Sequence, residues 1–274
     1  FDGSGHRIFN LVSTKGLFDT IDQGSVVKNL TVEGEILGGD EQENIGILAG
    51  SNAGAIENCV TRGTLNAETA VGGITGKNEE TGSVSRSENE AAIDGKMQTG
   101  GIAGLNEGSI SDCVNSGKIN TNQKIKKQAE GDGSSVNISI PNAVTGLTAD
   151  ERANETGGIA GNSSGDISYC TNTATIGFER LGSSTGGIVG RQLGSLSYCA
   201  NKGVVYGHKN VGGISGVLEP YEESSYDRDY RQELSDELDR LGDLIDDVSN
   251  QGEKLGDNLS DNADLLSDQL VHQS

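Results

Sequence analysis

The sequence predicts an all-β fold, a right-handed parallel β-helix of about seven coils with about 28 residues each, followed by a C-terminal α-helical segment. Two repeated phrases and an unusual composition predict it. Only 32% of the 274 residues are hydrophobic, against roughly 45–50% in typical globular domains, so one broad core is not expected. A solenoid needs only a thin interior, because each coil packs on its neighbours.

The first phrase, G-G-I-x-G, gives the period of the repeat. Full copies, each with one preceding residue, occupy residues 71–76, 99–104, 156–161, 185–190 and 211–216, and looser copies occupy 16–19 and 45–50. Successive copies end 31, 26, 28, 57, 29 and 26 residues apart, so the interval of 57 residues holds one period and an insertion. Helical repeats are longer and have a 3.6-residue pattern, so we expect β-structure.

The second phrase, G-x-I-x-x-C-x-N-x-G-x-I, follows the first at a fixed phase. It occupies residues 54–65, 108–119, 165–176 and 194–205, and residues 82–93 carry Ser87 at the Cys position. Short apolar alternation between Gly and Asn predicts strands and turns, three of each per coil. A single coil buries too few side chains to offset its backbone entropy, so the coils must stack.

Equal phase predicts equal position, so like residues should form columns. Two aliphatic columns should face inward: Ile74, Ile102, Ile159, Ile188 and Ile214, and Ile56, Val84, Ile110, Ile167 and Leu196. A ladder of amides should satisfy turn backbone groups through Asn89, Asn115, Asn172 and Asn201. The glycines of the phrases should permit positive φ angles or close contact between coils.

The four cysteines, Cys59, Cys113, Cys170 and Cys199, share one phase, where the first coil has Leu30. This pattern predicts a buried column of small apolar side chains. Adjacent coils lie about 4.8 Å apart, within disulfide range, whereas Cys59 and Cys113 are two coils apart. At most one bridge is therefore expected, Cys113–Cys170 or Cys170–Cys199. The spacing does not suit zinc, and no metal or other cofactor is expected.

Three N-terminal stretches, residues 1–8 (FDGSGHRI), 16–19 (GLFD) and 27–34 (VKNLTVEG), resemble the GLUG-motif repeats of bacterial cell-surface proteins, which also occur in the non-catalytic region of some IgA peptidases. The later phrases look like further turns of this repeat, so the resemblance covers roughly residues 1–218. Asp19 stands at the family's fourth glycine. The resemblance implies a secreted or cell-wall-attached protein that presents a surface, and it supplies no catalytic residues.

Charge and hydropathy exclude two classes of partner. The net charge of −21 repels nucleic acid, which requires a basic surface. Insertion into a membrane is not expected, because no run of 18 apolar residues occurs. The chain begins at Phe1 and its only methionine is Met97, so we expect a fragment of a longer precursor.

The sequence favours a protein that is not an enzyme. The histidines, His6, His208 and His272, lie far from any nucleophile pattern. The alternative is a β-helical carbohydrate-active enzyme, a polysaccharide lyase or glycosidase, which needs paired carboxylates on one face. Asp40, Glu41 and Glu43 cluster in one turn, which we interpret as a solvated acidic turn.

Two features are candidates for contact with a host surface protein or a glycan. Tyr169 and Tyr198 precede cysteines of adjacent coils, so they should point outward and stack, either as a ligand contact or as an aromatic ladder without a ligand. The insertion at residues 121–155 carries Lys124, Lys126 and Lys127. Insertions on solenoids often form the binding face, although this one could also be a covering loop.

The segment 219–274 differs from the repeat domain, residues 1–218, from which Pro220 separates it. It has 17 acidic and 4 basic side chains, a net charge of −13. Apolar residues spaced by 3 and 4 over 234–270 predict an amphipathic helix or coiled coil. This segment would oligomerise, lead to a following domain, or cover the last coil.

Overall fold

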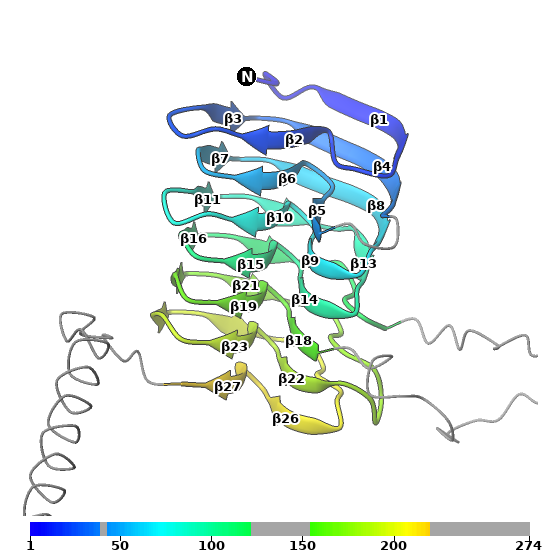
Figure 1. Cartoon of the computed structure of the whole chain (residues 1–274), viewed down its shortest axis with the longest axis vertical. Coiled ribbons are helices and arrows are strands. Elements are labelled where there is room, and N and C mark those ends of the chain that lie inside the picture. Colours follow the sequence, from blue (N-terminus) through cyan, green and yellow to red (C-terminus); the bar gives the residue numbers. More distant parts are fainter. Residues whose placement is uncertain (39–42, 122–153, 220–274) are drawn as a thin grey trace, which may run out of the picture. The chain divides into compact units, whose positions relative to one another are not determined.

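The protein, described by a computed structural model over residues 1–38, 43–121 and 154–219, is a parallel β-solenoid (Figure 1). Each complete coil crosses four sheets, called D, C, A and B in the order in which the chain meets them. Strands of successive coils pair in parallel, and none of the described residues is helical. The colours of Figure 1 run coil by coil along the stack, so neighbours in space are one period apart in sequence.

Sheets D and C carry the two halves of the first phrase. Sheet D consists of β5 (Glu43–Gly46), β9 (Thr69–Gly72), β14 (Met97–Gly100), β18 (Asn154–Gly157), β22 (Ser183–Gly186) and β26 (Lys209–Gly212). Sheet C consists of β2 (Phe18–Ile21), β6 (Ala49–Asn52), β10 (Thr75–Asn78), β15 (Ala103–Asn106), β19 (Ala160–Ser163), β23 (Val189–Gln192) and β27 (Ser215–Leu218).

Sheets A and B carry the second phrase. Sheet A consists of β3 (Val26–Lys28), β7 (Ala55–Glu57), β11 (Ser83–Ser85), β16 (Ser109–Ser111), β20 (Asp166–Ser168) and β24 (Leu196–Ser197). Sheet B consists of β1 (Arg7–Ser13), β4 (Thr31–Leu37), β8 (Val60–Asn66), β12 (Glu88–Asn89), β17 (Val114–Asn115), β21 (Thr171–Asn172) and β25 (Ala200–Asn201), and β13 (Ala92–Asp94) pairs with β8.

Two details of the predicted architecture are corrected. The solenoid has about six turns rather than seven coils, because each of the seven copies of the first phrase contributes one strand to sheet C and seven strands enclose six turns between them. A complete coil has four strands rather than three, because the Gly-Gly bend divides the first phrase between sheets D and C, and the coil of residues 69–94 has β13 as a fifth. The right-handed sense of the coil stays a prediction, and the C-terminal helical segment and its boundary with the repeat domain lie outside the described residues.

The predicted aliphatic columns form the interior. Ile74, Ile102, Ile159 and Ile188 are fully buried, and their backbones bond in sequence, from Ile74 N–H to Ile102 O (3.1 Å) through Ile159 N–H to Ile188 O (2.7 Å). The sheet A column is in register from Val27 to Leu196. Ile214 is 40% exposed, because its coil is the last one described.

The predicted amide ladder is confirmed. Asn89 Nδ2 donates to Asn115 Oδ1, Asn115 donates to Asn172, and Asn172 donates to Asn201, each at 2.8 Å. The same amides bond backbone groups of their own turns, for example Asn115 Nδ2 to Gly117 O at 2.9 Å. These bonds satisfy buried polar groups that would otherwise destabilise the fold.

The glycines of the first phrase serve close contact rather than positive φ, whereas Gly63 of the second phrase has a φ angle of 104°. None of the glycines in the five full copies has a positive φ angle. A Cβ added at Gly101 would overlap the carbonyl oxygen of Gly158 and the side chain of Asn115, so the second glycine of the phrase leaves room for the amide ladder. Asp19, which replaces a phrase glycine, lies exposed in the first strand of sheet C and pairs with Lys15 at 2.8 Å.

Candidate functional surface

The bend from sheet A to sheet B repeats a left-handed backbone conformation. One residue per coil has a φ angle between 49° and 55° at this bend: Asn29, Asn58, Arg86, Asp112, Tyr169 and Tyr198. For each of the first five, the N–H group donates to a sheet A carbonyl of the next coil at 3.1 Å. The bends therefore form a regular column on the surface, called here the bend column.

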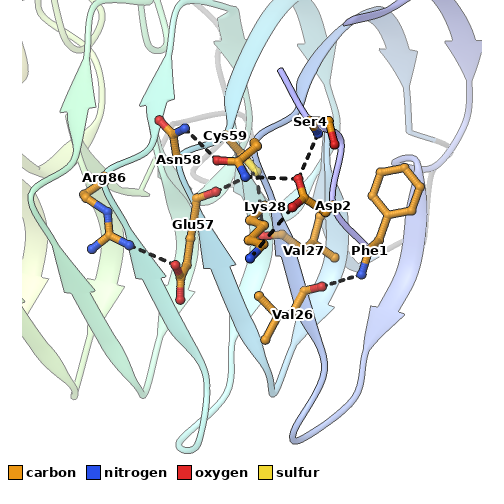
Figure 2. A network of polar contacts seen from close by, with 11 residues as sticks. Phe1, Asp2, Ser4, Val26, Val27, Lys28, Glu57, Asn58, Cys59 and Arg86 are labelled. Atoms are coloured by element: carbon orange, nitrogen blue, oxygen red, sulfur yellow. Dashed lines mark hydrogen bonds and ion pairs between the residues drawn. The ribbon is translucent and has the colours of Figure 1, made fainter. Parts of the chain in front are cut away.

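The N-terminal end of the bend column is a polar network. Asn58 Nδ2 donates to Asn29 Oδ1 at 2.8 Å, and Asn29 Nδ2 donates to Asp2 Oδ1 at 3.0 Å. In Figure 2 the Arg86 guanidinium reaches the Glu57 carboxylate, at 2.9 Å. Asn and Asp adopt left-handed conformations more readily than other non-glycine residues. Asn29 and Asn58 therefore suit the positive φ angles of their bends.

The C-terminal end of the column carries the predicted tyrosine pair. Tyr169 and Tyr198 are 58% and 77% exposed, and their rings stack with centroids 4.8 Å apart and planes 8° apart. The prediction that they point outward and stack is confirmed. A bulky residue with a positive φ angle costs about 1–3 kcal/mol of strain, which an aromatic stack of about 0.5–1.5 kcal/mol offsets only in part.

Beside the tyrosines, the outer face of sheet A presents rows of hydroxyl groups. Ser85, Ser111, Ser168 and Ser197 are in register across four coils, and Ser83 and Ser109 lie beside them in a second row. They alternate with inward residues such as Ile110, so their side chains face outward. We call this set the serine face: Ser83, Ser85, Ser109, Ser111, Ser168, Ser195 and Ser197. Ser168 and Ser197 directly precede the two tyrosines.

The serine face and a second amide ladder were missed by the sequence reasoning. The signal for the face was a Ser two residues before four of the five Cys-phase positions, Ser87, Cys113, Cys170 and Cys199, with a second Ser four residues before three of them. The second ladder joins Asn52 to Asn78 and Asn78 to Asn106, each at 2.8 Å, and Asn106 to Ser163 at 3.0 Å. Its signal was a polar residue two positions after the last glycine of the first phrase.

The predicted cysteine column lies directly beneath the bend column. Cys59, Cys113 and Cys170 are buried, Cys199 is partly buried, and all four are free thiols. The contact with the Cys113 thiol, assisted by burial, raises the pKa of Cys170 to about 12. The Cys170 thiol and burial likewise raise the pKa of Cys199, and burial raises that of Cys59. The raised pKa values keep Cys59, Cys170 and Cys199 protonated at neutral pH.

The remaining candidates are dispersed or not described. Lys124, Lys126 and Lys127 lie outside the described residues, as do Asp40, Glu41, His272 and the predicted oligomerisation segment 234–270. His6 Nδ1 lies 2.9 Å from Gly3 O, and His208 is exposed near the last coil. Among the described residues, no group of three or more His, Cys, Asp or Glu side chains is arranged to hold a metal ion.

No helix within the described ranges is long and apolar enough to cross a membrane.

The comparisons with known proteins agree with the repeat. The family model described as "The GLUG motif" matches residues 95–120, which make up one coil from just before β14 to the end of the turn after β17. Halomucin of Haloquadratum walsbyi is 35% identical over 85 residues, which cover 28% of this chain and 1% of halomucin. No solved structure matches the chain significantly. The chain thus carries a GLUG motif, and one motif corresponds to one coil.

Proposed function

We propose that this chain is a non-enzymatic, adhesin-like module of a secreted or cell-surface protein, which contacts an uncharged glycan through the tyrosine pair and the serine face. The observation that carries the proposal is the exposed stack of Tyr169 and Tyr198 in a strained backbone beside in-register hydroxyl rows. Strained conformations of bulky residues point to function, because stability alone does not favour them.

The chemistry of this surface suits a polyol. Serine hydroxyls both donate and accept hydrogen bonds, as sugar hydroxyls do, and tyrosine adds apolar area with a polar tip. Each tyrosine turns one ring face to the other, so the ring edges, hydroxyls and outer faces remain for contact. The net charge of −21 disfavours anionic glycans, which selects for a neutral one.

A GLUG-motif β-solenoid resembles the repeats of cell-surface proteins, which supports an extracellular location. The matched region covers only 1% of halomucin, so the activity of a whole protein does not transfer to this chain. A rigid stack of coils would hold the contact surface in fixed register away from its attachment.

The test is binding of the full chain to a glycan array with neutral, sialylated and sulfated members. The variant Tyr169→Asn/Tyr198→Asn installs the residue that the bend column itself uses at Asn29 and Asn58, so the fold should remain. We expect the natural chain to bind neutral glycans. In the variant the affinity should fall at least tenfold, which corresponds to a loss of about 1.4 kcal/mol or more in binding free energy. Absence of glycan binding by the natural chain, or equal binding by the variant, would contradict the proposal.

Catalysis is tested separately with the same preparations. We expect no release of reducing ends or unsaturated products from neutral and acidic polysaccharides above the rate without protein. Product formation that the chain catalyses would instead favour the carbohydrate-active enzyme.

A further inference from the structure

Three of the four cysteines occupy the same position on successive coils. Cys113 and Cys170 are joined through the bond from Thr171 N–H to Cys113 O, and Cys170 and Cys199 through the bond from Ala200 N–H to Cys170 O, both at 2.9 Å. Cys170 is therefore the neighbour of both other thiols. A bridge to one of them excludes a bridge to the other.

The three thiols have the same orientation. Each Sγ lies 3.2–3.3 Å from the carbonyl oxygen two residues earlier and 3.7–3.9 Å from a carbonyl of the preceding coil. Equivalent atoms are thus about one strand spacing apart, about 4.8 Å. This value falls within the Cα separation of disulfides and just beyond the usual Cβ separation of about 3.5–4.5 Å. A bridge needs a rotation of the thiols and a small approach of the two coils.

The two possible cysteine pairs differ in how easily their coils can move toward each other. Cys113 and Cys170 have no exposed surface, and both lie between complete coils. Cys199 is partly exposed, and its coil contains Leu196 and Asn201, which are also only partly buried. The pair Cys170–Cys199 therefore combines a thiol that a reagent can reach with a coil that can move.

We propose that Cys170 and Cys199 form a disulfide when the protein meets a small disulfide oxidant, and that this bridge holds the last complete coil (β22–β25) to the coil before it. The Cys199 thiolate attacks the oxidant, which releases one small thiol and leaves a mixed disulfide on Cys199. The Cys170 thiolate then attacks Cys199 Sγ and displaces the second small thiol. Two protein thiols are oxidised, one oxidant disulfide is reduced, and Cys113 stays free.

The protonation of the thiols affects the rate of disulfide formation, but it does not determine which two cysteines are joined. Both reacting thiols have raised pKa values, so the reactive thiolate is scarce at neutral pH. We expect the rate of bridge formation to rise with pH throughout the mildly alkaline range.

The test oxidises the full native chain with 4,4′-dithiodipyridine and maps the disulfides after tryptic digestion. Arg180 and Arg191 lie between the two cysteines, so digestion separates their peptides. We expect two equivalents of released thiopyridone per chain and a linked peptide pair that contains Cys170 and Cys199. The matched control Cys113→Ser should give the same pair, whereas Cys199→Ser should not give it.

Three outcomes would overturn the proposal: a Cys113–Cys170 pair, a mixed disulfide that persists on Cys199, or a bridge that does not slow the opening of the last complete coil. The last outcome is measured by limited trypsin cleavage at the exposed Lys202 and Lys209. We expect cleavage of the oxidised chain to be at least about fivefold slower, because the cross-link reduces local opening.

Discussion

At the scale of single residues, phase within the repeat determined most of what the structure contains. The inward isoleucines, the cysteine column and the ladder through Asn115 were predicted, because identical phases in a stack of strands place side chains directly over one another. The serine face and the ladder through Asn78 were not predicted, because polar residues of short glycine-flanked strands look the same in sequence whether they face solvent or the interior. Only the neighbouring coils decide which way they face.

The phrase glycines allow a sharp comparison between two equivalent positions. A methyl group at Gly101 would overlap a backbone oxygen and Asn115, whereas one at Gly213, the same position in the last coil, meets no heavy atom within 4 Å. We expect Gly101→Ala to lower the free energy of unfolding by about 1–3 kcal/mol. Gly213→Ala should change it by less than about 0.5 kcal/mol, as surface substitutions do. Denaturant titration of both variants measures this, and similar losses would contradict the packing argument.

The amide ladder gives a second residue-scale prediction. Asn115 donates to Asn172 and to Gly117 O and accepts from Asn89, so Asn115→Ala leaves buried polar groups without partners. We expect a loss of about 2–4 kcal/mol in the free energy of unfolding. The control Asn201→Ala, at the half-buried end of the ladder, should lose only about 1 kcal/mol, because water reaches the freed groups. Thermal unfolding that ranks the two variants in the opposite order would refute this.

At the scale of the elements, the sequence predicted that each coil consists of strands, but it did not predict how many strands a coil has. The alternation in each phrase predicted strands, yet the bend at Gly72 and Gly73 divided one expected strand into β9 and β10. Sequence alone does not reveal such a corner, because Gly-Gly is equally compatible with a continuous strand and with a turn. Neighbouring coils are also joined by ion pairs between residues about one period apart, such as Arg62 and Glu90.

The pair between Arg62 and Glu90 predicts a weak dependence of stability on pH. Arg62 donates two hydrogen bonds to the Glu90 carboxylate, at 2.6 and 2.8 Å, which lower the pKa of Glu90. A carboxyl with a lowered pKa stabilises the fold above its unfolded pKa and loses this contribution as pH falls through the folded pKa. Arg62→Gln should therefore cost less than about 1 kcal/mol at neutral pH, since the pair is partly exposed, and nothing in strong acid.

NMR titration should show the pKa of Glu90 rising toward its ordinary value in Arg62→Gln. An unchanged pKa would contradict the assignment of the shift to Arg62. Glu90→Gln serves as the control. In a chain that carries Glu90→Gln, the further substitution Arg62→Gln should change the free energy of unfolding less than it does in the natural chain, because only the attraction between Arg62 and Glu88 remains.

At the scale of the whole molecule, the period of the repeat predicted a solenoid. The number of turns and the state of the first and last coils could be determined only from the structure. Seven copies of the phrase suggested seven coils. They form seven stacked strands of sheet C, and the chain makes one turn between each strand and the next, which gives about six turns. The GLUG match at residues 95–120 lies in the middle of the stack, where β15 pairs with a strand on each side. The stability of such an array is close to a sum of coils and nearest-neighbour interfaces, so position along the stack should matter more than local composition.

Hydrogen exchange measured by mass spectrometry on the full chain tests this last point. β14 and β15 pair with a described strand on both sides, whereas β26 and β27 pair only with β22 and β23 within the described ranges. Apolar side chains of the last coil, such as Ile214 and Leu218, are exposed. We therefore expect amides of β26 and β27 to exchange at least about tenfold faster than those of β14 and β15, because opening them breaks one interface rather than two. Equal protection would mean that a further element covers the last coil and that its interface is as strong as one between two coils.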